Sequence, residues 1–203
     1  LRDCRINTIF EGSSEIMRLF IAREALDPHL KVAGAVLNSQ LPLGVRATAA
    51  MKAGLFYASW YPRQWLPSLA NVNADPAFAR HLVFARRTAK RLARSLYHAM
   101  VLNGPKLEKQ QVLLGRFVDI GTELFALTAT CARAEAKLKE VKTLEEKESL
   151  LQLVECFCQQ SRLRIAQHFA GRRVGSAVHL LANEVCQVLP KRETRRPGHT
   201  QVY

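Results

Sequence analysis

The sequence predicts an all-α fold, a helical bundle, from two observations. Apolar side chains recur three and four residues apart, a spacing that places them on one face of an α-helix. One such run comprises Leu113, Phe117, Ile120, Leu124, Leu127 and Cys131. An aspartate is also twice followed by proline, at Asp27-Pro28 and Asp75-Pro76. This pair is typical of a helix start, because aspartate caps the first turn and proline fits inside it.

Caps, prolines and glycines divide the chain into seven expected helices. In chain order they cover residues 14–26, 28–39, 45–60, 76–102, 106–140, 144–170 and 174–189. Pro42 lies in the linker ahead of the third helix, and Pro62 and Pro67 interrupt the chain after it. A polar loop over residues 68–75 then leads into the fourth helix.

The later boundaries depend on three further signals. The Asn-Gly-Pro step at residues 103–105 ends the fourth helix, since glycine and proline both interrupt helical backbone. Thr143 and Glu146 have the spacing of a capping box, which starts the sixth helix. The Gly-Arg-Arg step at residues 171–173 is expected to break the chain before the seventh helix.

The chain carries a formal net charge of +13 and has a pI near 10.0. Such a balance suits nucleic acid, an anionic membrane surface or polyanionic nucleotide cofactors, and composition alone does not choose among them. The five cysteines are scattered and odd in number, which favours free thiols in a reducing compartment over a disulfide framework. Neither the cysteines nor the six histidines have the spacing of metal ligands, so no metal site is expected.

The first residues of the chain suggest chemistry. Glu11 lies on a short loop just ahead of Gly12, Ser13 and Ser14, which start a helix. A helix N-terminus offers free backbone N–H groups and a positive dipole end to an anionic group. Glycine lets a ligand approach the backbone closely. The alternative is an ordinary capped helix with Glu11 solvated on its loop.

The stretch from Arg5 to Arg18 reads RINTIFEGSSEIMR and is followed by IARE at residues 21–24. It resembles the signature R-I-x-x-I-[YF]-E-G-[TS]-[NS]-[EQ]-I-x-R of the acyl-CoA dehydrogenase family. The resemblance implies an FAD-dependent oxidoreductase of fatty acid beta-oxidation with acyl-CoA as substrate. It also implies electron-transfer flavoprotein or a similar acceptor as a partner, and a homodimer when full-length. The location it implies is the cytoplasm or the mitochondrial matrix.

The family's residue roles carry over by position. Glu11 occupies the place of the base that removes the α-proton of the thioester. The β-hydrogen leaves as hydride to N5 of FAD, and the product is the trans-2-enoyl-CoA. Gly12 would line the thioester end of the substrate. The residues that would contact FAD are Ser13, Ser14 and Glu15.

The rest of the chain resembles, less specifically, the helical extension of the long-chain members of that family, with its clearest likeness over residues 111–134. This implies a long-chain acyl-CoA substrate. Three parts are expected. Residues 1–40 are the end of the catalytic helical domain and contain the Glu-Gly-Ser motif, residues 41–190 are the extension, and residues 191–203 are a basic, disordered tail.

Two features of the extension suggest a surface role. The aromatic cluster comprises Phe56, Tyr57, Trp60, Tyr61 and Trp65. The basic face of the helix over residues 78–102 comprises Arg80, Arg86, Arg87, Lys90, Arg91 and Arg94. Both suit peripheral contact with an anionic membrane, such as the inner membrane. Alternatively, the rings pack into a core and the cations pair with acids elsewhere in an oligomer. No nucleic-acid motif accompanies them, so nucleic acid is not an expected partner.

Two further alternatives stay open. Arg18 and Arg23 lie either near phosphates of the cofactor and CoA or in surface salt bridges. The chain as a whole is either part of a working dehydrogenase or a catalytically silent helical module that binds a membrane or a partner.

We predict that this chain by itself neither retains FAD nor turns over acyl-CoA. The resemblance implies that the β-domain and the first helices that complete the flavin site are not within these 203 residues. The visible absorbance of the purified chain checks this, and a stoichiometric yellow flavin would contradict it.

Overall fold

The computed structural model describes residues 13–38, 40–67 and 74–188, and for Leu37, Pro105 and residues 172–188 it describes the backbone alone. This part of the chain contains helices and no strand, which confirms the all-α prediction. The elements are α2 (Ser14–Leu37), α3 (Leu43–Arg63), α4 (Pro76–Asn103), the 3-10 helix η1 (Gly104–Lys109), α5 (Gln111–Leu138) and α6 (Leu144–Val188).

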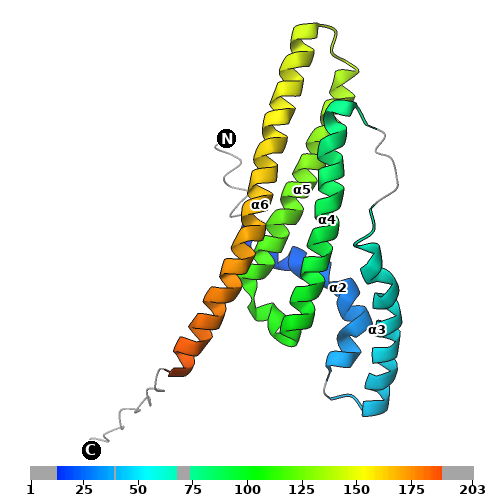
Figure 1. The fold of residues 1–203 in the computed structure, drawn as a ribbon, viewed down its shortest axis with the longest axis vertical. Coiled ribbons are helices and arrows are strands. Elements are labelled where there is room, and N and C mark those ends of the chain that lie inside the picture. The colour runs from blue at the N-terminus through cyan, green and yellow to red at the C-terminus, as the bar shows by residue number, and fades with distance from the viewer. Residues whose placement is uncertain (1–12, 39, 68–73, 189–203) are drawn as a thin grey trace, which may run out of the picture.

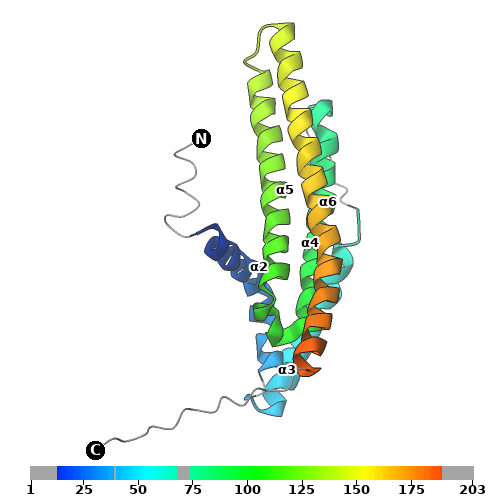
Figure 2. The same cartoon turned by 90° about the vertical axis from the view of Figure 1, so that its left-hand side faces the viewer.

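Helices α4, α5 and α6 lie side by side as a long bundle, and α2 and α3 pack beside one end of it (Figure 1). Within the bundle, α5 lies against both α4 and α6. Helix α2 contacts α3 on one side and α5 on another. Its N-terminal half points away from the long axis of the bundle (Figure 2). Helix α5 is therefore the element that connects the motif helix α2 to the rest of the fold.

Two apolar cores hold these helices together. The first lies between α4, α5 and α6 and includes Phe78, Ile120, Leu127 and Ile165, each at most 2% exposed. The second lies between α2, α4, η1 and α5. Its buried members are Ala22, Leu26, Ala99, Met100, Leu107, Leu114, Phe117 and Val118. Because a fully buried Leu or Phe contributes about 1.5–3 kcal/mol, the second core is a sufficient reason for α2 to pack against α5.

Several predicted helix ends are confirmed at the level of single hydrogen bonds. The Asp75 carboxylate accepts a hydrogen bond of 2.9 Å from the backbone N–H of Ala77, and Pro76 occupies the first turn of α4. The Thr143 hydroxyl accepts one of 3.3 Å from the N–H of Glu146. Gly104, with φ of 49°, ends α4 in the region of backbone space that favours glycine.

The predicted break at Asp27-Pro28 is wrong, because α2 runs through it as one helix of 24 residues. Proline inside a helix removes a hydrogen bond and costs roughly 3 kcal/mol. However, Leu26 and His29, which flank the Asp27-Pro28 step, are both buried. Tertiary packing therefore outweighs the local penalty. The helix bends along its length in Figure 1, as a proline is expected to cause. Asp27 pairs instead with Lys31 one turn later, at 2.6 Å.

The predicted break at residues 171–173 is also wrong, since α6 continues from Leu144 to Val188. A single glycine costs a helix only about 1 kcal/mol. The Arg116 guanidinium of α5 donates a hydrogen bond to the Gly171 carbonyl, which holds that turn against α5. Two smaller differences concern helix ends: α5 begins at Gln111 because η1 takes up the preceding residues, and α3 runs on to Arg63 with Pro62 inside its last turn.

The basic face of α4 is used largely inside the chain. Lys90 donates to the carbonyls of Arg63 and Leu66, at 3.4 and 2.8 Å, at the C-terminal end of α3. Arg94 donates to the Gln64 carbonyl at that same end. These two cations cap the negative end of the α3 dipole. The alternative in which these cations pair with acids elsewhere in an oligomer therefore does not account for Lys90 and Arg94.

The same face also holds α6. Arg80 pairs with Glu155, and Arg91 lies 4.0 Å from the centroid of the Phe169 ring. Buried His81, 0% exposed, approaches the same Glu155 carboxylate at 2.8 Å. The Gln159 side chain donates to the other Glu155 oxygen at 2.8 Å. The Gln159 amide, followed by His81 and Arg80, lowers the pKa of Glu155 from its ordinary 4.5 to about 2.

We predict that Gly121→Ala stabilises the fold. Gly121 lies inside α5, and an added methyl group would meet nothing closer than the Leu92 Cδ2 atom at 4.0 Å. Alanine is favoured over glycine in a helix by about 1 kcal/mol, which corresponds to a rise in Tm of roughly 2–4 °C. Thermal denaturation followed by circular dichroism measures it. Gly171→Ala is the matched control. Its methyl group would meet the Arg116 guanidinium at 3.1 Å, so an equal gain there would contradict the packing described.

We predict that Glu155→Gln flattens the acid limb of the stability profile. Because the folded state lowers the pKa of Glu155, its contribution is complete above about 4.5 and is lost as the pH falls toward 2. The Tm of the wild-type chain should therefore fall more steeply over this window than that of Glu155→Gln. Glu148→Gln, at an exposed position of the same helix, should keep the wild-type slope. Equal slopes for wild type and Glu155→Gln would contradict the role given to this carboxylate.

Candidate functional site

Helix α2 begins inside the sequence motif, directly after the Glu-Gly-Ser step at residues 11–13. Ser13 is the N-cap, and its hydroxyl accepts a hydrogen bond of 3.5 Å from the N–H of Ile16. The Ser13 carbonyl accepts the first helical bond, of 3.0 Å, from Met17. The next two residues, Ser14 and Glu15, are exposed in the first turn. The predicted helix start is therefore confirmed, and its hydroxyl-bearing end is open to a ligand.

The predicted base and its neighbour lie outside the described residues. Glu11 and Gly12 directly precede the N-cap Ser13 in the chain. Their roles, like those of Ser13, Ser14 and Glu15 toward a cofactor, remain predictions.

The residues at this helix end have the chemistry that a flavin dinucleotide requires. The first N–H groups of a helix have no intrahelical partner, and the dipole is positive there. An exposed hydroxyl at Ser14 adds a second kind of donor beside them. Phosphate and carbonyl oxygens accept such bonds. The exposed first turn of α2 therefore fits a role in holding part of the expected FAD.

Arg18, one turn further along α2, forms a salt bridge. Its Nε lies 2.9 Å from Oδ1 of Asp119 on α5. The Nδ1 atom of His168 on α6 lies 3.8 Å from the other oxygen of Asp119. Of the two interpretations of Arg18, the structure therefore supports the salt bridge. No sequence pattern indicates Asp119 or His168 as neighbours of Arg18, because both are far from it in the chain.

Arg23 is exposed and lines a cavity of about 640 Å³ between α2, η1 and α5. Glu108 of η1 and Gln111 of α5 line the same cavity. No ion pair of Arg23 is present among the described residues. The structure thus brings Arg23 beside polar groups and leaves its guanidinium accessible.

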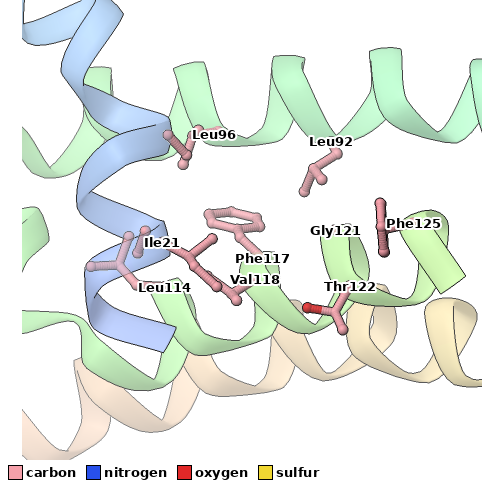
Figure 3. A pocket seen from close by; sticks show the side chains of 11 residues that line it. Ile21, Leu92, Leu96, Leu114, Phe117, Val118, Gly121, Thr122 and Phe125 are labelled. Atoms are coloured by element: carbon pink, nitrogen blue, oxygen red, sulfur yellow. The ribbon is translucent and has the colours of Figure 1, made fainter. Parts of the chain in front are cut away.

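A second cavity, of about 360 Å³, lies between the motif helix and the bundle (Figure 3). Ile21 of α2, Leu92 and Leu96 of α4 and Phe117 of α5 point into it. Thr122 contributes the one hydroxyl among its lining side chains. No lining residue carries a charge, so this cavity suits apolar groups and offers nothing for proton transfer or phosphate binding.

The aromatic cluster of α3 packs largely against its own chain. Tyr57 and Trp60 meet His29 of α2 and Tyr97 of α4, with ring centroids 4.8–6.5 Å apart. The Tyr57 hydroxyl lies 3.0 Å from Nδ1 of His29. Burial lowers the pKa of His29 and raises the pKa of Tyr57. These rings form a joint between three helices, as the core interpretation expects.

The outer part of the cluster remains accessible. The Tyr61 hydroxyl lies 2.9 Å from Nε2 of His98, and Trp65 is 61% exposed beneath the Arg94 guanidinium. No helix among the described residues is apolar and long enough to cross a membrane. The described histidine, cysteine and acidic side chains form no group that could hold a metal ion.

The side chains of three of the five cysteines are described, and all three are free thiols: Cys131, Cys156 and Cys158. The sulfur atoms of Cys131 and Cys158 lie 3.8 Å apart inside the first core. Burial raises the pKa of Cys158 to about 12, which disfavours the reactive thiolate. These buried thiols therefore act as packing groups.

Comparison with known proteins identifies similar sequences and one similar structure. No family model matches the chain. Over 176 residues, 83% of the chain, it is 47% identical to a Mycobacterium tuberculosis protein named "Probable acyl-CoA dehydrogenase FadE10". It is 26% identical over 174 residues to the human mitochondrial very long-chain specific acyl-CoA dehydrogenase. In both cases the chain spans 26% of the relative, about a quarter of its length.

A solved structure has the same fold over most of the chain. It is an acyl-CoA dehydrogenase of Bacillus anthracis complexed with FAD, with a TM-score of 0.56 and 24% sequence identity. The likeness covers 97% of this chain and 30% of that one. Helices α2–α6 therefore adopt an arrangement that also occurs in a flavin-containing dehydrogenase.

Proposed function

Because the chain belongs to the acyl-CoA dehydrogenase family, we propose that it supplies the catalytic base and a flavin-contacting helix end to an enzyme that oxidises acyl-CoA. The observation that carries the proposal is the 47% identity to a named dehydrogenase, together with the Glu-Gly-Ser-Ser motif at the open N-terminus of α2. The product is the trans-2-enoyl-CoA.

Glu11 has the chemistry and the place of the base. A carboxylate on the loop before a helix N-terminus can accept the α-proton if it reaches the α-carbon. Enclosure between a flavin and an acyl chain would raise its pKa toward the working pH, since burial disfavours the charged form. When bound, FAD supplies the acceptor for the hydride that leaves the β-carbon. One C–H bond thus gives a proton to Glu11, and the other gives a hydride to the flavin.

The neighbouring residues have binding roles in this proposal. Gly12, without a side chain, lets the thioester approach the backbone. Ser13 and Ser14 offer hydroxyls, and the first turn of α2 offers N–H donors to the cofactor. The Glu15 side chain lies at the same exposed helix end. The chain orients cofactor and substrate here, and the remaining walls of the site belong to the rest of the enzyme.

The finer points of the proposal concern substrate, partners and location. A long-chain acyl-CoA is supported by the likeness to relatives named very long-chain specific. Electron-transfer flavoprotein or a similar acceptor, and a homodimer, follow from family resemblance. The human relative is named mitochondrial, which agrees with action in the matrix, or in the cytoplasm of a bacterium.

Other readings of the chain have less support. Contact with an anionic membrane would use the basic face of α4, yet Arg80, Lys90, Arg91 and Arg94 already contact α3 or α6. A catalytically silent module would have no need of the unbroken motif around Glu11. We therefore favour the enzyme.

In the full-length, flavin-loaded enzyme, Glu11→Gln should retain FAD and lose dehydrogenation by about 10²–10⁴-fold, the contribution of a general base. Anaerobic bleaching of the flavin by acyl-CoA in a stopped-flow instrument measures this. Glu24→Gln, at an exposed carboxylate later in α2, is the matched control and should react like wild type. Flavin reduction by Glu11→Gln at a near-normal rate would rule out Glu11 as the base.

A further inference from the structure

Asp119 lies where the motif helix meets the extension. Its two carboxylate oxygens face different helices: Oδ1 accepts from Arg18 of α2 at 2.9 Å, and Oδ2 lies 3.8 Å from Nδ1 of His168 on α6. The Asp119 side chain is 24% exposed and that of His168 is 30% exposed. The carboxylate on α5 thus pairs with Arg18 of α2, and the imidazole of His168 from α6 lies near its other oxygen.

The first turns of α2 have little apolar support among the described residues. Ile16 is 62% exposed, Met17 43% and Phe20 56%, and the first buried residue of the helix is Ala22. Among the ion pairs of the described residues, Arg18–Asp119 alone joins α2 to another helix. The direction of these turns therefore depends on a polar contact to a degree that the second half of α2 does not.

Arg18 is well placed to transmit this contact to the site. It follows Ser14 by four residues, so the two lie on one face of the helix, one turn apart. An anchor at Arg18 fixes the axis of the turn that begins at the N-cap Ser13. A small rotation of that axis would move the donors of the first turn and the loop that carries Glu11. Reaction rates are sensitive to displacements of about 1 Å.

We propose that Asp119 is a positioning residue: through Arg18, the extension sets the direction of the catalytic-motif helix. His168 of α6 lies 3.8 Å from the second carboxylate oxygen, so α6 also borders this ion pair. This inference rests on the proposed function for its catalytic consequence. It gives the extension a part in the reaction without contact with substrate or cofactor.

The matched control lies one turn away on the same helix. Glu123 of α5 pairs with Arg164 of α6 through two hydrogen bonds, of 2.6 and 3.0 Å. This pair joins α5 to α6 and involves no residue of α2. Glu123→Gln therefore removes a charge from α5 and leaves both members of the Arg18–Asp119 pair in place. Glu123→Gln should therefore lower Tm without speeding amide hydrogen exchange in the motif helix α2.

The test uses the full-length, flavin-loaded enzyme and measures kcat together with amide hydrogen exchange over residues 13–22. Asp119→Asn should lower kcat about two- to fivefold, the range expected for a half-exposed ion pair, and speed exchange in this segment. Asp119→Glu should recover most of both. Arg18→Gln should match Asp119→Asn, and the double variant should be no worse than either alone. Glu123→Gln should leave both readouts at the wild-type value.

The inference is overturned if Asp119→Asn and Glu123→Gln behave alike in both readouts, or if the Arg18 and Asp119 effects add. That result is distinct from failure of the proposed function, in which wild-type enzyme would not reduce its flavin with acyl-CoA. In that event the exchange measurement still decides whether Asp119 positions α2: faster exchange in Asp119→Asn supports the inference, and unchanged exchange overturns it.

Discussion

The burial of α5 on two sides is the constraint on which the rest of the structure depends. One set of its apolar residues, Ile120, Leu124 and Leu127, is buried against α4 and α6. Another set, Leu114, Phe117 and Val118, is buried against α2 and α4. Because α5 contributes to both cores, the motif helix α2 and helix α6 both pack against it. The apolar cavity beside Phe117 and the ion pair at Asp119 both lie where α2 meets α5.

Features of the fold that depend on residues close together in the sequence are predicted well, and features that depend on another helix are not. The spacing of Phe117, Ile120, Leu124 and Leu127 predicts a buried helix face, and all four are buried. The caps at Asp75 and Thr143 are local interactions over two or three residues, and both form. Pro28 and Gly171 are local signals too, but their penalties of a few kcal/mol are outweighed by burial and by Arg116, which comes from another helix.

The candidate site shows the same difference between local and long-range interactions. The open helix start at Ser13 is predicted from adjacent residues and is present in the structure. The partners of Arg18, and the use of Lys90 and Arg94 as caps for α3, join residues far apart in the chain. No periodicity or motif indicates such pairs. For the same reason His29 and Tyr97, which complete the aromatic joint, could not be chosen from the sequence.

We propose that this chain is one part of a divided catalytic site, to which it supplies the base and a cofactor-facing helix end, and that helix α5 orients that helix through Asp119. An anaerobic titration of the full-length, flavin-loaded enzyme with long-chain acyl-CoA tests this most directly. We predict that one flavin is reduced for each trans-2-enoyl-CoA formed. A flavin that stays oxidised in the presence of bound acyl-CoA would contradict it.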